Sequence, residues 1–214
     1  MKIVLTPIAL FLTALCFGQN SFYFATPIPA NSNKVVSVDA QYYGEYKDDE
    51  RSLSYVFNSE GITVTSTNIN SIGKKVIRES STYQVKNDHI FGVVPDDSLP
   101  CVLEKGRYYF GVKNSDPLIF GGSKHVLTRI DSRRYIINYF ENAKYVPMLI
   151  EFDGKSMTMK DFNYDPESTS FSFIQNQEKI TENDQNLVIL SPTETEFQSL
   201  NNDLYFTKSG QFVK

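Results

Sequence analysis

The stretch Lys124–Phe162, KHVLTRIDSRRYIINYFENAKYVPMLIEFDGKSMTMKDF, decides the fold of this chain. It contains four runs that alternate apolar and polar residues: KHVLTRID, RYIINYF, YVPMLIEF and KSMTMKDF. Alternation with a period of two is typical of strands that bury one face. Short turn-forming segments separate the runs, so the sequence predicts an antiparallel, up-and-down β-meander.

The turns predict a register for this meander. An Asp153-Gly154 tip, which is a strong hairpin signal, pairs Phe152 with Lys155 and sets Ile150 opposite Met157 and Met148 opposite Met159.

The two earlier turns extend this register. A loop at Glu141–Lys144 pairs Phe140 with Tyr145, Ile137 with Met148 and Tyr135 with Ile150, and a Ser132-Arg133 tip sets Ile130 opposite Tyr135.

One face of the predicted sheet is therefore apolar and rich in Met and Tyr, and the other is mostly polar. The apolar face comprises Val126, Ile130, Tyr135, Ile137, Tyr139, Val146, Met148, Ile150, Met157 and Met159. The polar face comprises Arg129, Asn138, Glu151, Ser156 and Lys160, interrupted by Leu127, Ile136 and Leu149. Pro147 lacks an N–H and predicts one local break in the pairing.

The rest of the chain adds further strand patterns and one helix. SLSYVF and ITVTST predict a hairpin, Ile69–Lys74 a turn, and Lys75–Val85 a long polar strand, while RYYFGVK and PLIF are read as separate strands. Near the end, NLVIL predicts a buried strand. The following S-P-T-E predicts a helix capped by Ser191 that ends near Asn201, with Phe197 and Leu200 facing the body, before a turn at Ser209-Gly210.

The predicted fold class is all-β: a meander that closes into a barrel or a strongly curved sheet, with one short C-terminal helix. Five segments follow from these patterns: a signal peptide at 1–18, an extended leader at 19–40, the meander at 41–162, a polar connection at 163–185, and a strand-helix-strand unit at 186–214. In the leader, Phe22 and Phe24 are candidates to plug the domain.

The N-terminus and the composition predict export. Lys2, an apolar run to Phe17 and a small Gly18 form a secretory signal pattern that resembles exported proteins of Bacteroidetes, and we expect a periplasmic or extracellular location. Leu15 before Cys16 disfavours lipid anchoring there. No second apolar run has spanning length, and the mildly acidic balance without a basic patch argues against nucleic acid. Cys101, the one cysteine after the signal, cannot form an internal disulfide.

Motifs for catalysis or metal binding are weak in this sequence. His89 and His125 have no second ligand at metal spacing, and Cys101 lacks the glycine elbow or helix start that would activate a thiol. Glu45, Glu104 and Glu151 lie on separate predicted strands, so a carboxylate pair is conceivable only if the fold brings them together. We therefore predict no cofactor, no metal and no catalytic residue.

The meander, the helix at Ser191–Asn201 and the strand near Leu204 are similar in outline to the lipocalin or calycin arrangement. Gly44-Glu45-Tyr46 on the first strand resembles that family's G-x-W motif, with Tyr in place of Trp. The resemblance implies a small apolar ligand inside a barrel. The residues expected to line it are Tyr135, Ile137, Tyr139, Met148, Ile150, Met157 and Met159.

Two alternatives stay open. The Met and Tyr face could simply fill a solid core, because Met suits irregular packing as well as apolar ligands. In that case the chain is a non-enzymatic interaction or assembly protein of the cell envelope. Exposed aromatic side chains among Tyr42, Tyr43, Tyr108 and Tyr109 would then favour a protein partner.

Overall fold

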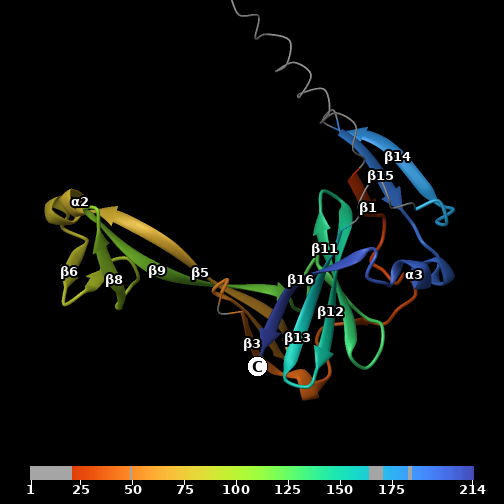
Figure 1. Cartoon of the computed structure of the whole chain (residues 1–214), viewed down its shortest axis with the longest axis horizontal. Helices are drawn as coiled ribbons and strands as arrows, with labels where there is room; N and C mark the ends of the chain where they lie inside the picture. Colours follow the sequence, from red (N-terminus) through yellow and green to blue (C-terminus); the bar gives the residue numbers. More distant parts are fainter. Residues whose placement is uncertain (1–20, 49, 164–170, 183–184) are drawn as a thin grey trace, which may run out of the picture.

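The computed structural model describes residues 21–48, 50–163, 171–182 and 185–214 (Figure 1). The predicted signal peptide and Cys16 lie outside these residues. The described residues contain two short α-helices, α2 (Lys74–Glu79) and α3 (Glu194–Leu200), and a 3-10 turn at Ala40–Tyr42. The strands of the body are β1 (Ser21–Phe24), β2 (Lys34–Val35), β3 (Gly44–Asp48), β4 (Leu53–Asn58), β10 (Val126–Arg129), β11 (Arg134–Glu141), β12 (Lys144–Asp153), β13 (Ser156–Phe162), β14 (Gln177–Glu182), β15 (Gln185–Leu190) and β16 (Phe206–Val213). The other strands are β5 (Gly61–Gly73), β6 (Gln84–Lys86), β7 (His89–Phe91), β8 (Ser98–Glu104) and β9 (Arg107–Ile119).

The chain is mostly antiparallel β, and among the described residues the sheet is not closed. Its order is β14-β15-β1-β12-β13-β16-β3-β4-β5-β9-β8-β7-β6, and β11, β10 and β2 branch from β12. The one parallel pair described is β1 with β15. Figure 1 shows a body on one side and an arm, made of β5 and β9, that projects from it.

The predicted meander is present, with one register confirmed in full. In the β11–β12 pair, Phe140 lies opposite Tyr145, Ile137 opposite Met148 and Tyr135 opposite Ile150, as the turn at Glu141–Lys144 predicts. The tip is Asn142-Ala143, and both residues have positive φ. This is the conformation that a right-twisted two-residue hairpin favours.

The predicted β12–β13 register is wrong by two residues. The tip is Gly154-Lys155, so Phe152 pairs with Met157 and Ile150 with Met159. Gly154 has φ 59 as the first tip residue, and this placement pairs two buried side chains instead of Phe152 with Lys155. Because a shift of two preserves side-chain parity, the predicted apolar face survives.

The predicted β10–β11 register is wrong by one residue, which changes the face. Arg129 lies opposite Tyr135, and a loop of residues 130–133 replaces the two-residue tip. The Asp131 carboxylate shapes this loop by accepting hydrogen bonds from the backbone N–H groups of Arg133 and Arg134 at 2.8 and 2.9 Å. Leu127 was predicted to lie on the polar face, but it points into the buried Met and Tyr face. Val126 and Ile130 were predicted to lie on that face, and Ile130 packs on the opposite side.

Both faces of the meander are buried, because two hydrophobic clusters cover it. The inner core lies on the Met and Tyr face and includes Val38, Tyr42, Tyr46, Tyr55, Phe57, Ile62, Ile119, Leu127, Phe152, Phe212 and the predicted lining residues. The outer core lies on the opposite face and includes Phe24, Ile28, Ile136, Leu149, Phe171, Ile174, Val188, Leu190, Phe197, Leu200, Tyr205 and Phe206. The outer core thereby explains Ile136 and Leu149, two of the three apolar residues that interrupt the predicted polar face.

A buried polar network fixes the leader to the meander. The side-chain amide of Asn138 is fully buried; its Oδ1 accepts from the Ile28 N–H at 2.8 Å and its Nδ2 donates to the Ile28 carbonyl at 3.1 Å. Thr128 Oγ1 also donates to that carbonyl. Phe24, in β1, is fully buried in the outer core. Pro147 lies where β12 changes partner, between Tyr145, which pairs with β1, and Met148, which pairs with β13.

The arm was not predicted. β5 continues through the expected turn at Ile69–Lys74 and pairs with β9 over its whole length, including Pro117. In place of a polar strand at Lys75–Val85, α2 turns the chain at the tip, so the prediction of a single helix is wrong. β6, β7 and β8 complete a small lobe with its own arm core of Ile90, Cys101 and Phe110, against which Ile72, Ile77, Val85, Val93, Leu99, Tyr108 and Val112 pack.

Two details of the C-terminal unit differ from prediction. Helix α3 is capped by Thr193 with Glu196, not by Ser191 with Glu194, because Thr193 forms the complete capping box. Phe197 and Leu200 face the body as expected. In place of a turn at Ser209-Gly210, β16 runs through to Val213 with a register shift opposite Met159 and Lys160, which is a bulge at Ser209.

Candidate interaction surface

The arm presents one face that no described residue covers, and we call it the outer arm face. Side chains alternate along a strand, so β9 residues Tyr108, Phe110 and Val112 face the arm core while Tyr109, Gly111 and Lys113 face the other way. The pairing extends this face across the three strands. It comprises Ile69 and Ser71 of β5, Tyr109 and Gly111 of β9, and Pro100 and Val102 of β8.

The apolar residues of the outer arm face are strongly exposed. Ile69 keeps 72% of its accessible surface and Val102 keeps 69%. Val102 lies directly opposite Tyr109, and Ile69 directly opposite Gly111, two residues further along β9. Tyr109 therefore lies between them, directly beside Val102 and diagonally beside Ile69.

Gly111 keeps the middle of this face flat. A Cβ at this position would lie 2.8 Å from Thr67 Cγ2, which is closer than van der Waals contact allows. Any larger residue would therefore push β5 and β9 apart or displace Thr67.

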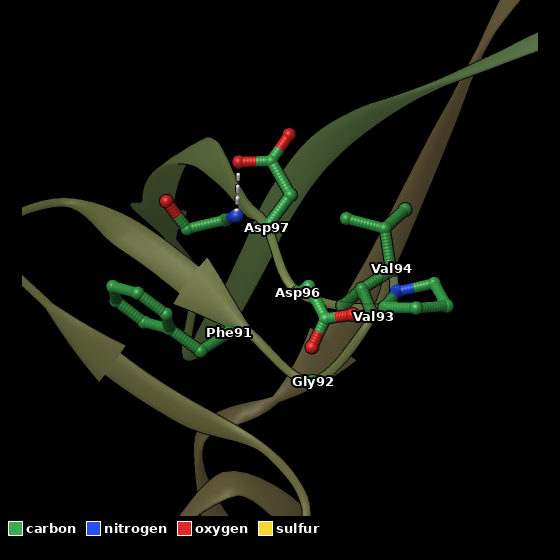
Figure 2. A pocket seen from close by; sticks show the side chains of 8 residues that line it. Phe91, Gly92, Val93, Val94, Asp96 and Asp97 are labelled. Carbon is green, nitrogen blue, oxygen red and sulfur yellow. Dashed lines mark hydrogen bonds between the residues drawn. The ribbon is translucent and has the colours of Figure 1, made fainter.

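The lobe at the end of the arm also has an open pocket, shown in Figure 2. Its volume is about 540 Å³, and one continuous stretch lines it: Phe91, Gly92, Val93, Val94, Pro95, Asp96, Asp97 and Ser98. Asp97 Oδ1 accepts a hydrogen bond from the Ser98 N–H at 2.7 Å, and Asp96 has φ 55. These features describe a tightly turned loop whose concave side is lined by both apolar and polar residues.

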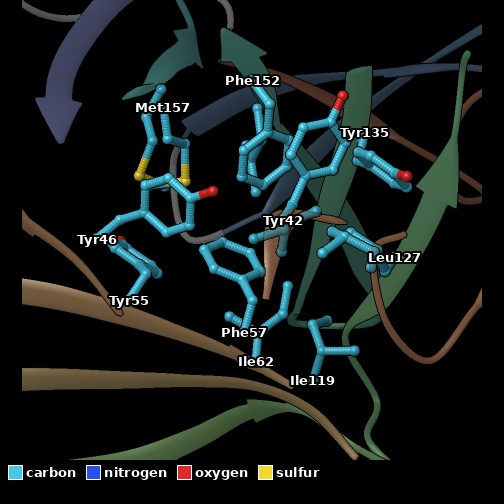
Figure 3. Close-up of a cluster of buried hydrophobic side chains, with 14 of the residues drawn as sticks. Tyr42, Tyr46, Tyr55, Phe57, Ile62, Ile119, Leu127, Tyr135, Phe152 and Met157 are labelled. Carbon is cyan, nitrogen blue, oxygen red and sulfur yellow. The ribbon is translucent and has the colours of Figure 1, made fainter. Parts of the chain in front are cut away.

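The predicted ligand-lining residues come together in the inner core (Figure 3). Tyr139 is partly buried there, and the other six are buried: Tyr135, Ile137, Met148, Ile150, Met157 and Met159.

Phe152, which was not among the predicted lining residues, is the centre of this core. Its ring stacks on Tyr42 of the 3-10 turn at 4.3 Å and meets Tyr46, Phe57 and Tyr135 edge-on at 5.5, 5.3 and 6.0 Å. Aromatic rings therefore occupy the middle of the body.

The tyrosine hydroxyls of the inner core differ in their surroundings. The Tyr135 hydroxyl accepts from the Asp39 N–H at 3.1 Å. The buried Tyr46 hydroxyl has no hydrogen-bond partner among the described residues. Burial raises the pKa of Tyr46, and it raises the pKa of Tyr139 far above the usual range. These groups stay protonated at physiological pH.

The two histidines and the cysteine lie apart. His125 Nδ1 accepts from the Phe140 N–H at 3.0 Å beside Tyr139, whereas His89 is on β7 in the arm. Cys101 is buried in the arm core, where burial and then the nearby Asp88 raise the pKa of its thiol. A raised pKa makes a thiol a poor nucleophile at neutral pH.

The three glutamates are also held separately. Glu45 pairs with Lys47 and accepts a hydrogen bond from Ser54 at 2.9 Å, and these contacts, Lys47 first, lower its pKa. Glu151 pairs with Lys160 at 2.9 Å, and Glu104 lies on β8 in the arm. Within the described ranges, no three His, Cys, Asp or Glu side chains form a group that could hold a metal ion. No helix there is long and apolar enough to cross a bilayer.

The four tyrosines whose exposure would favour a protein partner are buried or partly buried. Tyr42 is buried and Tyr43 packs against the inner core, while Tyr108 packs against the arm core. Tyr109 alone of the four belongs to the outer arm face. Ile69 was missed because the polar residues Asn68 and Asn70 disguise the continuation of β5. The alternation of Ile69 and Ser71 was the one available signal.

Comparison of the chain with protein-family models, with curated proteins and with solved structures gave no significant match.

Proposed function

We propose that this protein is a non-enzymatic interaction protein that binds another polypeptide with its arm. The observation that carries the proposal is the outer arm face, where Ile69 and Val102 are about 70% exposed. Contiguous exposed apolar side chains on a soluble surface are typical of interaction sites. The body supports the arm as a rigid base, because its interior is filled by the aromatic side chains around Phe152.

The arm itself suits this role. A two-stranded ribbon has little stability alone, and its middle section, residues 67–70 and 113–117, is exposed. The small arm core at its end holds α2 and β6–β8 together. A projecting element with low intrinsic stability gains order when a partner covers it.

Site-specific photo-cross-linking tests this proposal. A photoreactive residue is placed at Ile69 or Val102 on the arm, and at Leu204 or Val36 as exposed apolar controls on the body, in cells that produce the chain. We expect a discrete adduct from the arm positions alone. Equal adducts from the body positions, or no adduct from the arm, would refute the proposal. N-terminal sequencing of the exported fraction tests the accompanying proposal that residues 1–18 direct export.

A second candidate function is that of a lipocalin-like carrier, with a small apolar molecule held in a barrel formed by the body. The unpartnered Tyr46 hydroxyl favours it, because a polar group of a ligand could bind there, beside Phe152 and the predicted lining residue Met157. Native mass spectrometry of protein purified without denaturation is the test. A co-purifying small molecule that is lost on unfolding supports the carrier. A clean protein mass, with no thermal shift by fatty acids or isoprenoids, removes it.

A further inference from the structure

The arm has an open strand edge on β5. β4 pairs with β5 as far as Ser66, and the Thr67 N–H then donates to the Ser52 carbonyl at 3.0 Å. From Asn68 to Gly73 no described strand pairs with this side of β5, while β9 occupies the other side. A free strand edge presents backbone donors and acceptors that another strand can satisfy.

The hydrogen bonds at either end show which backbone groups face outward. Thr67 donates away from β9, and Lys74 donates to the Gly106 carbonyl at 2.9 Å, toward β9. The N–H and C=O groups of successive residues in an antiparallel strand point to opposite sides of the strand, and the β5–β9 register is uninterrupted over this length. The backbone groups of Ile69, Ser71 and Gly73 therefore point to the open edge. One of them is already engaged, because Arg107 Nη2 donates to the Ser71 carbonyl at 3.1 Å.

The two edges of the arm differ in how they resist strand addition. The free edge of β9, residues 111–117, contains Lys113, Asp116 and Pro117, and charges and proline at an edge discourage pairing. The free edge of β5, NINSIG, contains no charged residue and no proline. Its outward apolar side chain, Ile69, also belongs to the outer arm face.

We propose that the free edge of β5, Asn68–Gly73, binds an extended, uncharged segment of a partner protein as an added β-strand. Only an extended polypeptide matches a row of alternating backbone N–H and C=O groups. An apolar residue of the added strand would cover Ile69 on the outer arm face. This inference rests on the proposed binding function of the arm and names the partner's chemistry.

Two matched proline variants test the edge. Ile69→Pro and Lys113→Pro each remove an N–H that points away from the β5–β9 pair, so neither breaks an internal bond of the arm. A library of random twelve-residue peptides is selected on the immobilised wild-type chain, and the enriched peptide is synthesised. We expect it to bind wild type and Lys113→Pro equally, and Ile69→Pro at least tenfold more weakly. Circular dichroism establishes that both variants are folded.

Hydrogen exchange gives a second measurement that needs no variant. With the synthesised peptide bound, the amides of Ile69 and Gly73 should be protected, and those of Gly111 and Lys113 should exchange as before. Peptides that bind Ile69→Pro normally, or no enrichment at all, would overturn the inference. So would a dimer that Ile69→Pro abolishes in sedimentation, because a second copy would then be the added strand. If cross-links formed only from the arm but the peptide and hydrogen-exchange tests failed, the proposed binding function of the arm would stand. Only the addition of a strand to β5 would be rejected.

Discussion

Tyr46 and Tyr135 offer a paired test of how the inner core is filled. Both side chains are fully buried in the same cluster, and both contact Phe152 edge-on. They differ in one respect: the Tyr135 hydroxyl accepts from the Asp39 N–H, whereas the Tyr46 hydroxyl has no described partner. Replacing each by Phe removes one oxygen and leaves the ring.

The two substitutions should change the free energy of unfolding in opposite directions. A buried polar group without a partner costs about 1–3 kcal/mol, so Tyr46→Phe should stabilise the protein by about 1–2 kcal/mol. A partnered hydroxyl contributes about 0.5–1.5 kcal/mol net, so Tyr135→Phe should destabilise by about that amount. The difference between the variants is then about 1.5–3.5 kcal/mol, above the error of a urea titration.

Equilibrium urea unfolding followed by far-ultraviolet circular dichroism measures both variants, because the chain contains no Trp for fluorescence. Unchanged m-values establish that the folded and unfolded states have the same compactness. If Tyr46→Phe destabilised the protein by 1 kcal/mol or more, its hydroxyl would have a partner in solution. Repeating the titration on protein refolded from denaturant would then show whether that partner was a removable small molecule, as the carrier function requires.

Three further predictions concern the body. Phe152→Ala should cost about 3–5 kcal/mol of unfolding free energy in the same urea assay, and Phe120→Ala, at an exposed position, under about 0.5; similar losses would contradict the central place of Phe152. Asn138→Ala should cost about 2–4 kcal/mol, because the buried Ile28 N–H loses its acceptor, and a loss below 1 would mean that water replaces the amide. Burial alone would raise the pKa of Asp131, but hydrogen bonds from Arg133 and Arg134 lower it below its usual value of 3.8 in the folded protein. The ionised carboxylate therefore stabilises the folded state above pH 3.8, and this stabilisation is lost as the pH falls through the pKa of Asp131 in the folded protein. Asp131→Asn should therefore be less stable than wild type at about pH 6, with a gap that narrows in acid; a gap independent of pH would contradict this.

The accuracy of the predicted register differed between the three turns of the meander, because different interactions fix each turn. The β11–β12 register was correct because one tip places apolar residues opposite each other along the whole pair. At Gly154 two tips were compatible with the same buried face, and the pairing of Phe152 with Met157 decided between them. At β10 the side-chain hydrogen bonds of Asp131 enlarged the loop by an amount that alternation cannot reveal.

The candidate site was less predictable than the fold. The seven predicted lining residues do lie together, because parity along paired strands is a local property. That Tyr42 stacks on Phe152 in the middle of this core depends on the 3-10 turn at Ala40–Tyr42 packing against β12, which is a long-range contact. The arm was missed because polar Asn68 and Asn70 interrupt the apolar pattern of β5, and only pairing with β9 keeps them in a strand.

The sequence by itself determined the antiparallel β class, the buried Met and Tyr face, and the inward residues of the C-terminal helix. Each of these depends on the period of side chains along one element, and on the burial of apolar surface that this period permits. Only the tertiary structure decided which side of the sheet the leader covers, that both faces of the meander are buried, and that β5 and β9 leave the body as an arm. These features depend on contacts between segments far apart in the sequence, such as Ile28 with Asn138, which are 110 residues apart, and no local pattern encodes them.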